Sequence, residues 1–476
     1  QWCRWQRGLP RKIGGTFSAA RDLAQKVYGM HSFASGGSFY FHLGSESQLQ
    51  QRVINSMGAV TGFADRTPAG LVGSADNLWQ FDAIFNSASG DTVLAAHAAP
   101  NLEDISSTAN RAIWYGVITA AGILVDTTLS QVSGGILVVG NHLVSFGNGG
   151  FVAWSAANNV TTALSSGNVT QQKIVVGKRV RGGGAPAALL WSLDSLIQMT
   201  FTGAAPPAPL WDFDTVTDET SILSSRCVIE YDGIFYWLGV DRPLMYNGVV
   251  REIPNMMNVN YFYDGLNQQQ RQKVFAYKVP RFGEIWWCYP RGSATECTHA
   301  IIYNVREQTW YDTQLPDQGR TDGIYAKVYF KPFMMGAEQI AGNYDLWQHE
   351  TGVNRVRLAS TQPIPSHFET HEMSVVDAEE EAENKSLRVE RVEPDFIQVG
   401  DLTLTVRGRA NARSTVYDSA VFPFSAAAAT AGEQTVPLKE NRRLMSFRFD
   451  SNVVDGDYQM GDVLGHIEKT DARVTQ

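Results

Sequence analysis

The clearest fold signal in the chain is the segment Arg271–Leu315, which reads RQKVFAYKVPRFGEIWWCYPRGSATECTHAIIYNVREQTWYDTQL. It holds short runs of β-branched and aromatic residues, separated by turn signals that contain Pro and Gly. The runs are Lys273–Tyr277, Glu284–Tyr289, His299–Asn304 and Thr309–Asp312. Such runs predict antiparallel strands joined by hairpins. Four short strands in about 45 residues match the size of one β-propeller blade.

Similar sets of short runs recur along the chain and begin near residues 38, 78, 134, 173, 227, 273 and 323. Their spacing of about 40 to 55 residues is typical of propeller blades. Several sets end in an aromatic residue close to a turn, such as Trp154 and Trp310. The sequence therefore predicts an all-β fold, a β-propeller with six or seven irregular blades, and it leaves the choice between six and seven open.

Two further segments flank the predicted propeller. Ala19–Tyr28 predicts a short helix, because most of its residues favour helices. Beyond a boundary at Pro363, Leu402, Leu404 and Val406 alternate with polar residues, which predicts strands of a second, sandwich-like β-domain. The expected organisation is an N-terminal arm with a short helix at 1–37, the propeller at 38–360, and a C-terminal β-domain contacting the propeller at 361–476.

The composition fits this interpretation and limits the function. Charged residues make up 18% of the chain and aromatic residues 11%, with 12 Trp and 43 Gly, which favours strands and tight turns. The net charge of −9 argues against a protein that grips nucleic acid over its whole surface. An acidic wall would instead let DNA slide past. We expect no transmembrane helix, because no run of 18 apolar residues occurs in the sequence.

The sequence carries no motif for catalysis, and we expect no enzyme, cofactor or metal site. Walker A, GxSxG, HExxH and EF-hand patterns do not occur. The nearest candidate for a metal pair, His367 and His371, follows a Pro-rich segment that disfavours a helix. Cys288 and Cys297 flank one predicted hairpin and could pair, but free buried thiols are the favoured interpretation.

The first residues, QWCRWQRGLPRKIGG, predict an extended arm with Trp2, Trp5, Arg7 and Leu9 as its contact residues. Two roles are open: a strand that completes a sheet, or a docking segment for a partner protein. The arm lacks the apolar core of a signal peptide. It also lacks Met, so we expect additional residues before Gln1 in the full protein.

Three segments resemble one known family. They are Trp5–Gly15 (WQRGLPRKIGG), Asn267–Pro290 with its NQQQRQKVFA and FGEIWWCYP motifs, and Ser446–Asn452 (SFRFDSN) with the following Gly461–Val463. The pattern is similar to that of the tail-nozzle proteins of short-tailed bacteriophages, also called packaged-DNA stabilisation or head-completion proteins. The Tyr303-Asn304-Val305-Arg306-Glu307 motif belongs to the same resemblance.

The resemblance implies a β-propeller with added β-domains and a structural, non-enzymatic role. Such proteins form a hexameric ring below the portal and adaptor of the virion tail, retain packaged DNA and conduct it during ejection. The implied partners are further copies of the chain, the adaptor, tail fibre or spike proteins, and double-stranded DNA in transit. The protein would be made in the host cytoplasm and reside in the virion tail.

Loops rich in Gly and Pro are the candidates for a channel or gate in such a ring. They contain Gly182, Gly183 and Gly184, then Pro206 and Pro207, and finally Gly319 and Arg320. An alternative function is a glycan- or receptor-binding propeller of the tail, with or without glycan cleavage, which would need acids and aromatic residues converging in one pocket. A propeller scaffold for other protein partners is the third possibility.

Overall fold

The computed structural model describes residues 1–55, 60–99, 110–127, 129, 132–181, 186–204, 209–254, 257–327, 329–375, 385–411, 413–426 and 435–471. The chain divides into two compact units. We call Ser18–Gln348 the propeller unit, and Gln1–Phe17 together with His349–Gln476 the terminal unit. Strands dominate both units, so the all-β prediction is confirmed. Short helices occur at α1 (Met257–Gly265), η1 (Asn148–Gly150) and η2 (Gln268–Lys273).

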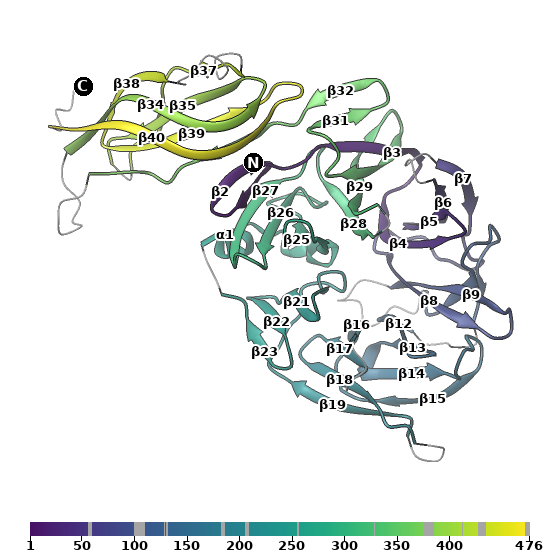
Figure 1. Ribbon diagram of the computed structural model, residues 1–476. Coiled ribbons are helices and arrows are strands. Elements are labelled where there is room, and N and C mark those ends of the chain that lie inside the picture. Colours follow the sequence, from purple (N-terminus) through teal and green to yellow (C-terminus); the bar gives the residue numbers. More distant parts are fainter. Residues whose placement is uncertain are drawn as a thin grey trace. The chain divides into compact units, whose positions relative to one another are not determined.

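The propeller unit is a ring of antiparallel blades, and its first six blades follow one another along the chain (Figure 1). Their strands are β4–β7 (Val27–Ser35, Ser38–Ser45, Leu49–Ile54, Val60–Asp65), β8–β11 (Leu78–Asn86, Asp91–Ala99, Trp114–Val117, Val125–Asp126), β12–β15 (Gly135–Val139, His142–Phe146, Phe151–Ser155, Ala163–Asn168), β16–β19 (Ile174–Arg179, Ala188–Ser192, Leu196–Phe201, Trp211–Thr217), β20–β23 (Ile229–Tyr231, Ile234–Leu238, Pro243–Tyr246, Val250–Glu252) and β24–β27 (Phe275–Val279, Glu284–Tyr289, His299–Asn304, Thr309–Gln314).

The last blade combines strands from distant parts of the sequence. It contains β28 (Arg320–Ala326), β29 (Lys331–Ile340) and β30 (Asn343–His349), and β3 (Thr16–Leu23) lies next to β30 as its fourth strand. The described residues therefore form seven blades, which resolves the choice between six and seven. The N-terminal strand closes the ring, because it completes the blade whose other strands come last in the propeller.

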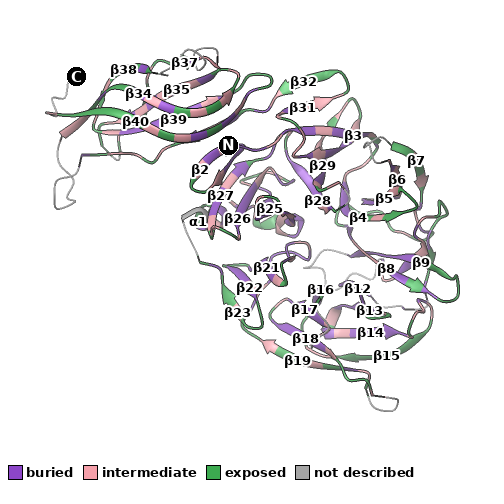
Figure 2. Cartoon of the chain, in the orientation of Figure 1, coloured by how far each residue is buried: buried purple, intermediate pink, exposed green. Residues whose placement is uncertain are grey.

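Burial changes with distance from the axis of the ring. The first strand of each blade is innermost, and first strands of neighbouring blades such as β4, β8, β12 and β16 lie against one another. Figure 2 shows buried residues concentrated on the inner and middle strands, whereas outer strands such as β15 and β23 carry mostly exposed residues. Apolar side chains thus hold the blades together from the inside.

The prediction of a short helix over Ala19–Tyr28 is wrong. Thr16–Leu23 form strand β3, and Val27 already begins the innermost strand of the first blade, upstream of the start expected at residue 38. Alternate residues of β3, such as Ser18 and Ala20, are buried. Local helix propensity is weak, at a few tenths of a kcal/mol per residue, so pairing and packing against distant strands decide the conformation.

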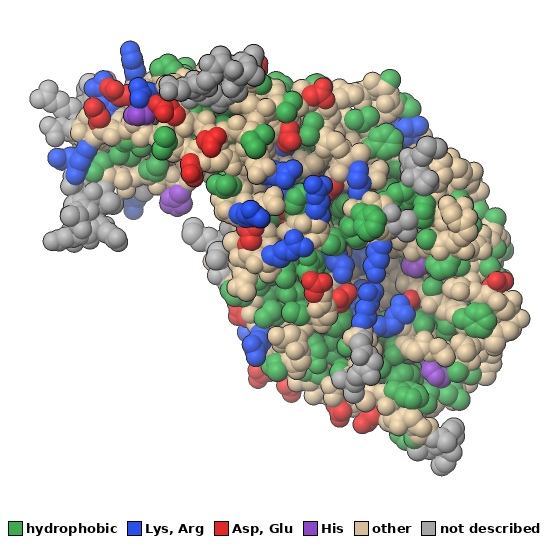
Figure 3. All heavy atoms as spheres, viewed as in Figure 1, with side chains coloured by type: hydrophobic (Ala, Val, Ile, Leu, Met, Phe, Trp, Pro, Cys, Tyr) green, Lys and Arg blue, Asp and Glu red, His purple; other side chains and the backbone are tan. Residues whose placement is uncertain are grey.

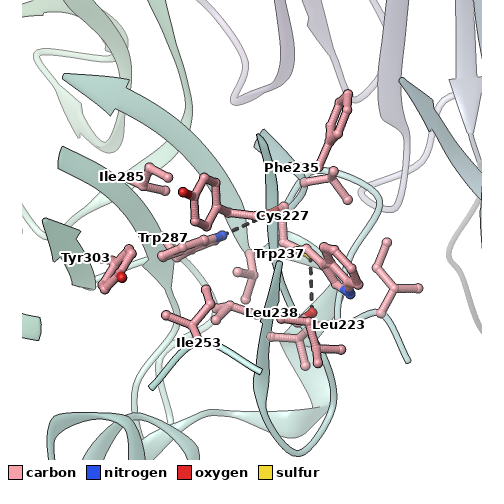
Figure 4. Packing of buried hydrophobic residues seen from close by; sticks show 14 of the residues in the cluster. Leu223, Cys227, Phe235, Trp237, Leu238, Ile253, Ile285, Trp287 and Tyr303 are labelled. Atoms are coloured by element: carbon pink, nitrogen blue, oxygen red, sulfur yellow. Dashed lines mark hydrogen bonds between the residues drawn. The ribbon is translucent and has the colours of Figure 1, made fainter. Parts of the chain in front are cut away.

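The segment Arg271–Leu315 forms strands β24–β27, as the sequence predicted. Its tryptophans are core residues: Trp286, Trp287 and Trp310 are at most 6% exposed. The indole Nε1 of Trp287 donates a hydrogen bond to the carbonyl of Cys227 at 2.8 Å, which links this blade to the preceding one (Figure 4). The expectation that these tryptophans pack in the core is confirmed.

The terminal unit has two sheets that enclose a shared apolar core. The first sheet has the order β1-β2-β40-β34-β38, the second has the order β33-β39-β35-β36, and β37 also pairs with β35. Leu402, Leu404 and Val406 point into the core, which confirms the sandwich-like domain. A hairpin of β31 (Asn354–Arg357) and β32 (Ser360–Pro363) is attached through pairing of β31 with Thr16 and Phe17. The strands of the two sheets are β1 (Cys3–Gln6), β2 (Leu9–Lys12), β33 (Ser366–Glu369), β34 (Lys385–Val399), β35 (Leu402–Arg409), β36 (Tyr417–Asp418), β37 (Phe422–Phe424), β38 (Val436–Arg442), β39 (Leu444–Ser451) and β40 (Asp457–Asp471).

The assignment of β3 gives a testable prediction. Ala20 is 4% exposed and belongs to one apolar cluster with Phe333, Met335 and Leu346. We predict that Ala20→Glu lowers the free energy of unfolding by about 3 kcal/mol or more, because the carboxylate would be buried without a partner. Arg21→Glu is the control on the opposite face of the strand and should have a small effect. Equal losses in the two variants, measured by urea denaturation, would show that β3 does not present Ala20 to this core.

Candidate functional site

A cavity of about 480 Å³ lies inside the propeller unit, and we call it the axial cavity. Its walls are built by the innermost strands β4, β8, β12, β16, β20, β24 and β28 and by residues directly beside them. Because every blade contributes, residues far apart in the sequence converge here. Cavities of a few hundred Å³ with converging polar groups are the usual sites for small ligands.

Charged side chains in the axial cavity are mostly basic. Among the described residues that line it, the basic ones are Lys178, Arg179, Arg181, Arg226 and Lys278, and the acidic ones are Asp82, Glu230 and Asp322. Figure 3 shows Lys and Arg side chains gathered around the hollow in the middle of the ring. The cavity is therefore locally positive, although the whole chain carries a net charge of −9.

Each lining carboxylate is paired with one of the cations. Asp82 lies 3.3 Å from Arg179, and Asp322 lies 3.3 Å from Arg226. The third pair joins Glu230 to the Lys278 ammonium at 3.4 Å. Asp82 also accepts a hydrogen bond from the backbone N–H of Val138. The three ion pairs neutralise the lining carboxylates. The cations without such a pair give the cavity an excess of positive charge.

Lys178 differs from the three paired cations. Within the described part of the chain, its ammonium group makes no hydrogen bond or ion pair. Desolvation lowers the pKa of Lys178, and the more distant carboxylates of Asp82 and Asp322 compensate only in part. A poorly solvated cation beside a cavity is stabilised when an anion enters.

His31 lines the axial cavity and forms a pair with His42 behind it. The Nδ1 atoms of His31 and His42 lie 3.4 Å apart, and His42 Nε2 lies 3.4 Å from an Arg66 guanidinium nitrogen. Burial lowers the pKa of His31 to about 4; Asp82 opposes the shift and Arg179 adds to it. Burial also lowers the pKa of His42 well below its ordinary value. Both imidazoles are therefore neutral at pH 7.

The candidate channel loops fall in different places. Gly182, Gly183, Gly184, Pro206 and Pro207 lie outside the described residues. Gly319 and Arg320 were expected in one loop, but Arg320 begins strand β28 and is fully buried.

The Arg320 guanidinium donates to the carbonyls of Pro316 and Gly319 at 2.8 Å each, and it is ion-paired with Asp317. Backbone pairing with β29 explains the strand, and local Gly content could not reveal that partner.

The arm residues lie in the terminal unit. Trp2 is 1% exposed, donates its indole N–H to the Gly14 carbonyl at 3.2 Å and packs near His349. Trp5 packs edge-on against Phe368. The arm forms the β1–β2 hairpin, and Arg11 pairs with Gln459 of β40, so the role as a strand completing a sheet is observed. Arg7 is exposed and Leu9 half-buried next to the hairpin turn, and partner docking by this turn stays a prediction.

Sequence reasoning missed the axial cavity. Arg179 and Arg181 were recognisable as a small basic patch, but Arg226 and Lys278 come from other blades. Only the ring closure brings these residues together. In the described ranges, no group of three or more His, Cys, Asp or Glu is placed to hold a metal ion. All four cysteines are free and buried, Cys288 and Cys297 included. None of the described helices has the length and apolar character needed to cross a membrane.

Comparison with known proteins gives one structural likeness. No family model matches the chain. No curated protein matches it either. Among solved structures, the chain is similar to the crystal structure of the WD40 beta propeller domain of Doa1, with a TM-score of 0.42 and 9% sequence identity. The alignment covers 70% of this chain and 97% of that chain.

The neutral histidines predict a pH dependence. An unfolded histidine takes up a proton near pH 6.5, whereas folded His31 does so only near pH 4. The unfolded state thus binds more protons between these values, and stability falls as the pH is lowered from about 6.5 to about 4. We predict that the free energy of unfolding of the His31→Gln variant falls by about 1 to 3 kcal/mol less than that of wild type over this pH range. Urea denaturation from neutral to acidic pH measures the free energy of unfolding. Identical dependence of this free energy on pH in wild type and variant would refute the prediction.

Proposed function

We propose that the protein is a structural subunit of a virus particle, namely a tail-nozzle protein of a short-tailed bacteriophage. Copies of the chain form a ring, expected to be a hexamer, below the portal and adaptor. The ring retains the packaged DNA and conducts it during ejection. The resemblance of three sequence segments to this family suggests the function, and the positions of these segments in the fold support it.

The observation that carries the proposal is that the first segment of the resemblance pairs with β40, the strand that holds Gly461–Val463 of the last segment. Arg11 in the first segment pairs with Gln459, which lies between the two parts of the last segment. The Lys12 ammonium donates to the Gly456 carbonyl at 2.7 Å and is 3% exposed. Burial lowers the pKa of Lys12 to about 8. The residues in and beside these segments are buried and contact one another. This is what we expect of a structural subunit without catalytic residues.

The central segment of the resemblance has the same character. Trp286 donates its indole N–H to the Glu284 carboxylate at 2.8 Å, and the Tyr311 hydroxyl donates to the other oxygen of Glu284 at 2.6 Å. The Glu284 side chain is fully buried. These residues hold the blade together. The acidic net charge also suits a wall past which DNA must slide.

A second candidate is a receptor-binding propeller of the tail, and the axial cavity favours it. The cavity would take an acidic ligand, because its cations outnumber its acids. Glycan cleavage fits less well. Burial raises the pKa of Glu230, but hydrogen bonding from the Gly233 N–H and the charge of Lys278 outweigh it, so the pKa is lowered and the carboxylate stays ionised. An ionised carboxylate such as Glu230 cannot act as a general acid. Burial raises the pKa of Asp322, but this carboxylate is held in an ion pair with Arg226.

The test of the proposed function is imaging of virions that contain this chain, combined with native mass spectrometry of the purified protein. We expect a closed ring on the tail axis. Copies located away from that axis, or a protein missing from virions, would refute the proposal. Glycan binding by a monomer would support the receptor-binding candidate.

The hairpin turn of the arm gives a prediction for assembly. We predict that Arg7→Glu reduces ring assembly at least about tenfold, as expected when a charge at an interface is reversed. The melting temperature of the isolated subunit should stay within a few degrees of wild type, because Arg7 is exposed. Arg413→Glu, at an exposed position between β35 and β36, is the matched control. Sedimentation would decide, and normal assembly of the Arg7→Glu protein would remove the turn from the interface.

A further inference from the structure

We propose that the axial cavity binds a small phosphorylated anion, with Lys178 as its main charge partner and Arg226 as a fixed positive charge in the wall. The inference concerns a single copy of the chain and does not depend on ring assembly. It assigns a ligand site to a part of the propeller that the proposed structural role leaves without a function.

The charge balance of the cavity selects the class of anion. Three of the five lining cations are paired with Asp82, Glu230 and Asp322. Lys178 and Arg181 remain as an excess of two positive charges. A phosphate group carries about 1.5 to 2 negative charges at pH 7, whereas a carboxylate carries one. A phosphorylated ligand therefore matches the excess more closely than a carboxylic acid does.

Lys178 supplies the strongest attraction. Its side chain is half-buried, and its ammonium has no hydrogen-bond or ion-pair partner among the described residues. A partly desolvated cation without a counter-ion is costly. Entry of an anion converts this cost into a charge-assisted contact, which is about twice as strong as a neutral hydrogen bond.

Arg226 is fixed in place at the cavity wall. Its guanidinium donates to the Thr321 carbonyl at 3.1 Å and to the Lys273 carbonyl at 2.8 Å, and it lies 3.3 Å from Asp322. The side chain is 8% exposed. Its Nε–H is buried, and within the described residues it has no acceptor. The Nε–H is closed off from the cavity, so Arg226 acts on an anion through the charge of its fixed guanidinium.

The volume of the cavity limits the ligand to a small molecule. About 480 Å³ accommodates inorganic phosphate or a nucleoside monophosphate. The same phosphate chemistry could thus come from an inorganic anion or from a free nucleotide. Binding of both probes to the same protein distinguishes these sources, since only the nucleotide can use the apolar part of the wall, such as Phe81 and Phe235.

The experiment is isothermal titration calorimetry of the full chain with inorganic phosphate and with AMP, without metal and at constant ionic strength. We expect saturable binding with one site per chain. Lys178→Met should weaken it about 10- to 100-fold, the range for a lost hydrogen bond to a charged group, whereas Lys178→Arg should retain most of it. Tighter binding of AMP assigns a nucleotide, and tighter binding of phosphate assigns an inorganic anion.

The controls separate a site from general attraction. Lys469→Met removes the same charge from an exposed position on β40 and should leave binding unchanged. The melting temperature of Lys178→Met without ligand should equal or exceed that of wild type, because the variant removes a desolvated charge. The absence of saturable binding to wild type, or equal weakening by Lys178→Met and Lys469→Met, would overturn the proposal.

Discussion

The closure of the ring by strand β3 is the constraint on which the rest of the propeller depends. Without β3, the strand β30 would be an open sheet edge, and such edges promote aggregation. Polar contacts reinforce the closure: the Thr321 hydroxyl donates to the Val27 carbonyl at 2.6 Å, and the Tyr28 hydroxyl donates to Glu296 at 2.9 Å. Because the axial cavity is lined by the first strand of each blade, its geometry exists only in the closed ring.

The closed ring also explains how an acidic protein has a positive interior. Net charge is a property of the whole surface, whereas the sign inside the ring depends on a few inward positions. Lys178, Arg226 and Lys278 come from three different blades and meet at the axis. The proposed structural role accounts for the interlocked termini and the packed blades. The proposed anion binding in the axial cavity is a separate property of each copy of the chain.

Local sequence signals predicted the parts of the fold that local pairing determines. The segment Arg271–Leu315 folds into sequential hairpins, so its turns and apolar runs contain most of the necessary information. Strand β3 was missed because its partner β30 is more than 300 residues away in the chain. The axial cavity was missed for the same reason, since no window of sequence contains both Lys178 and Arg226. Arg320 was misplaced because a Gly beside a charged residue suggests a loop wherever the pairing strand is unknown.

Hydrogen–deuterium exchange of the β3 amides in the native protein tests the closure of the ring most directly. If β3 is a full member of the last blade, peptides covering Thr16–Leu23 exchange as slowly as those of β29 and β30, and they open only with the whole propeller. If these peptides exchange orders of magnitude faster than β29 and β30, the N-terminal strand does not close the ring, and the account of the axial cavity fails with it.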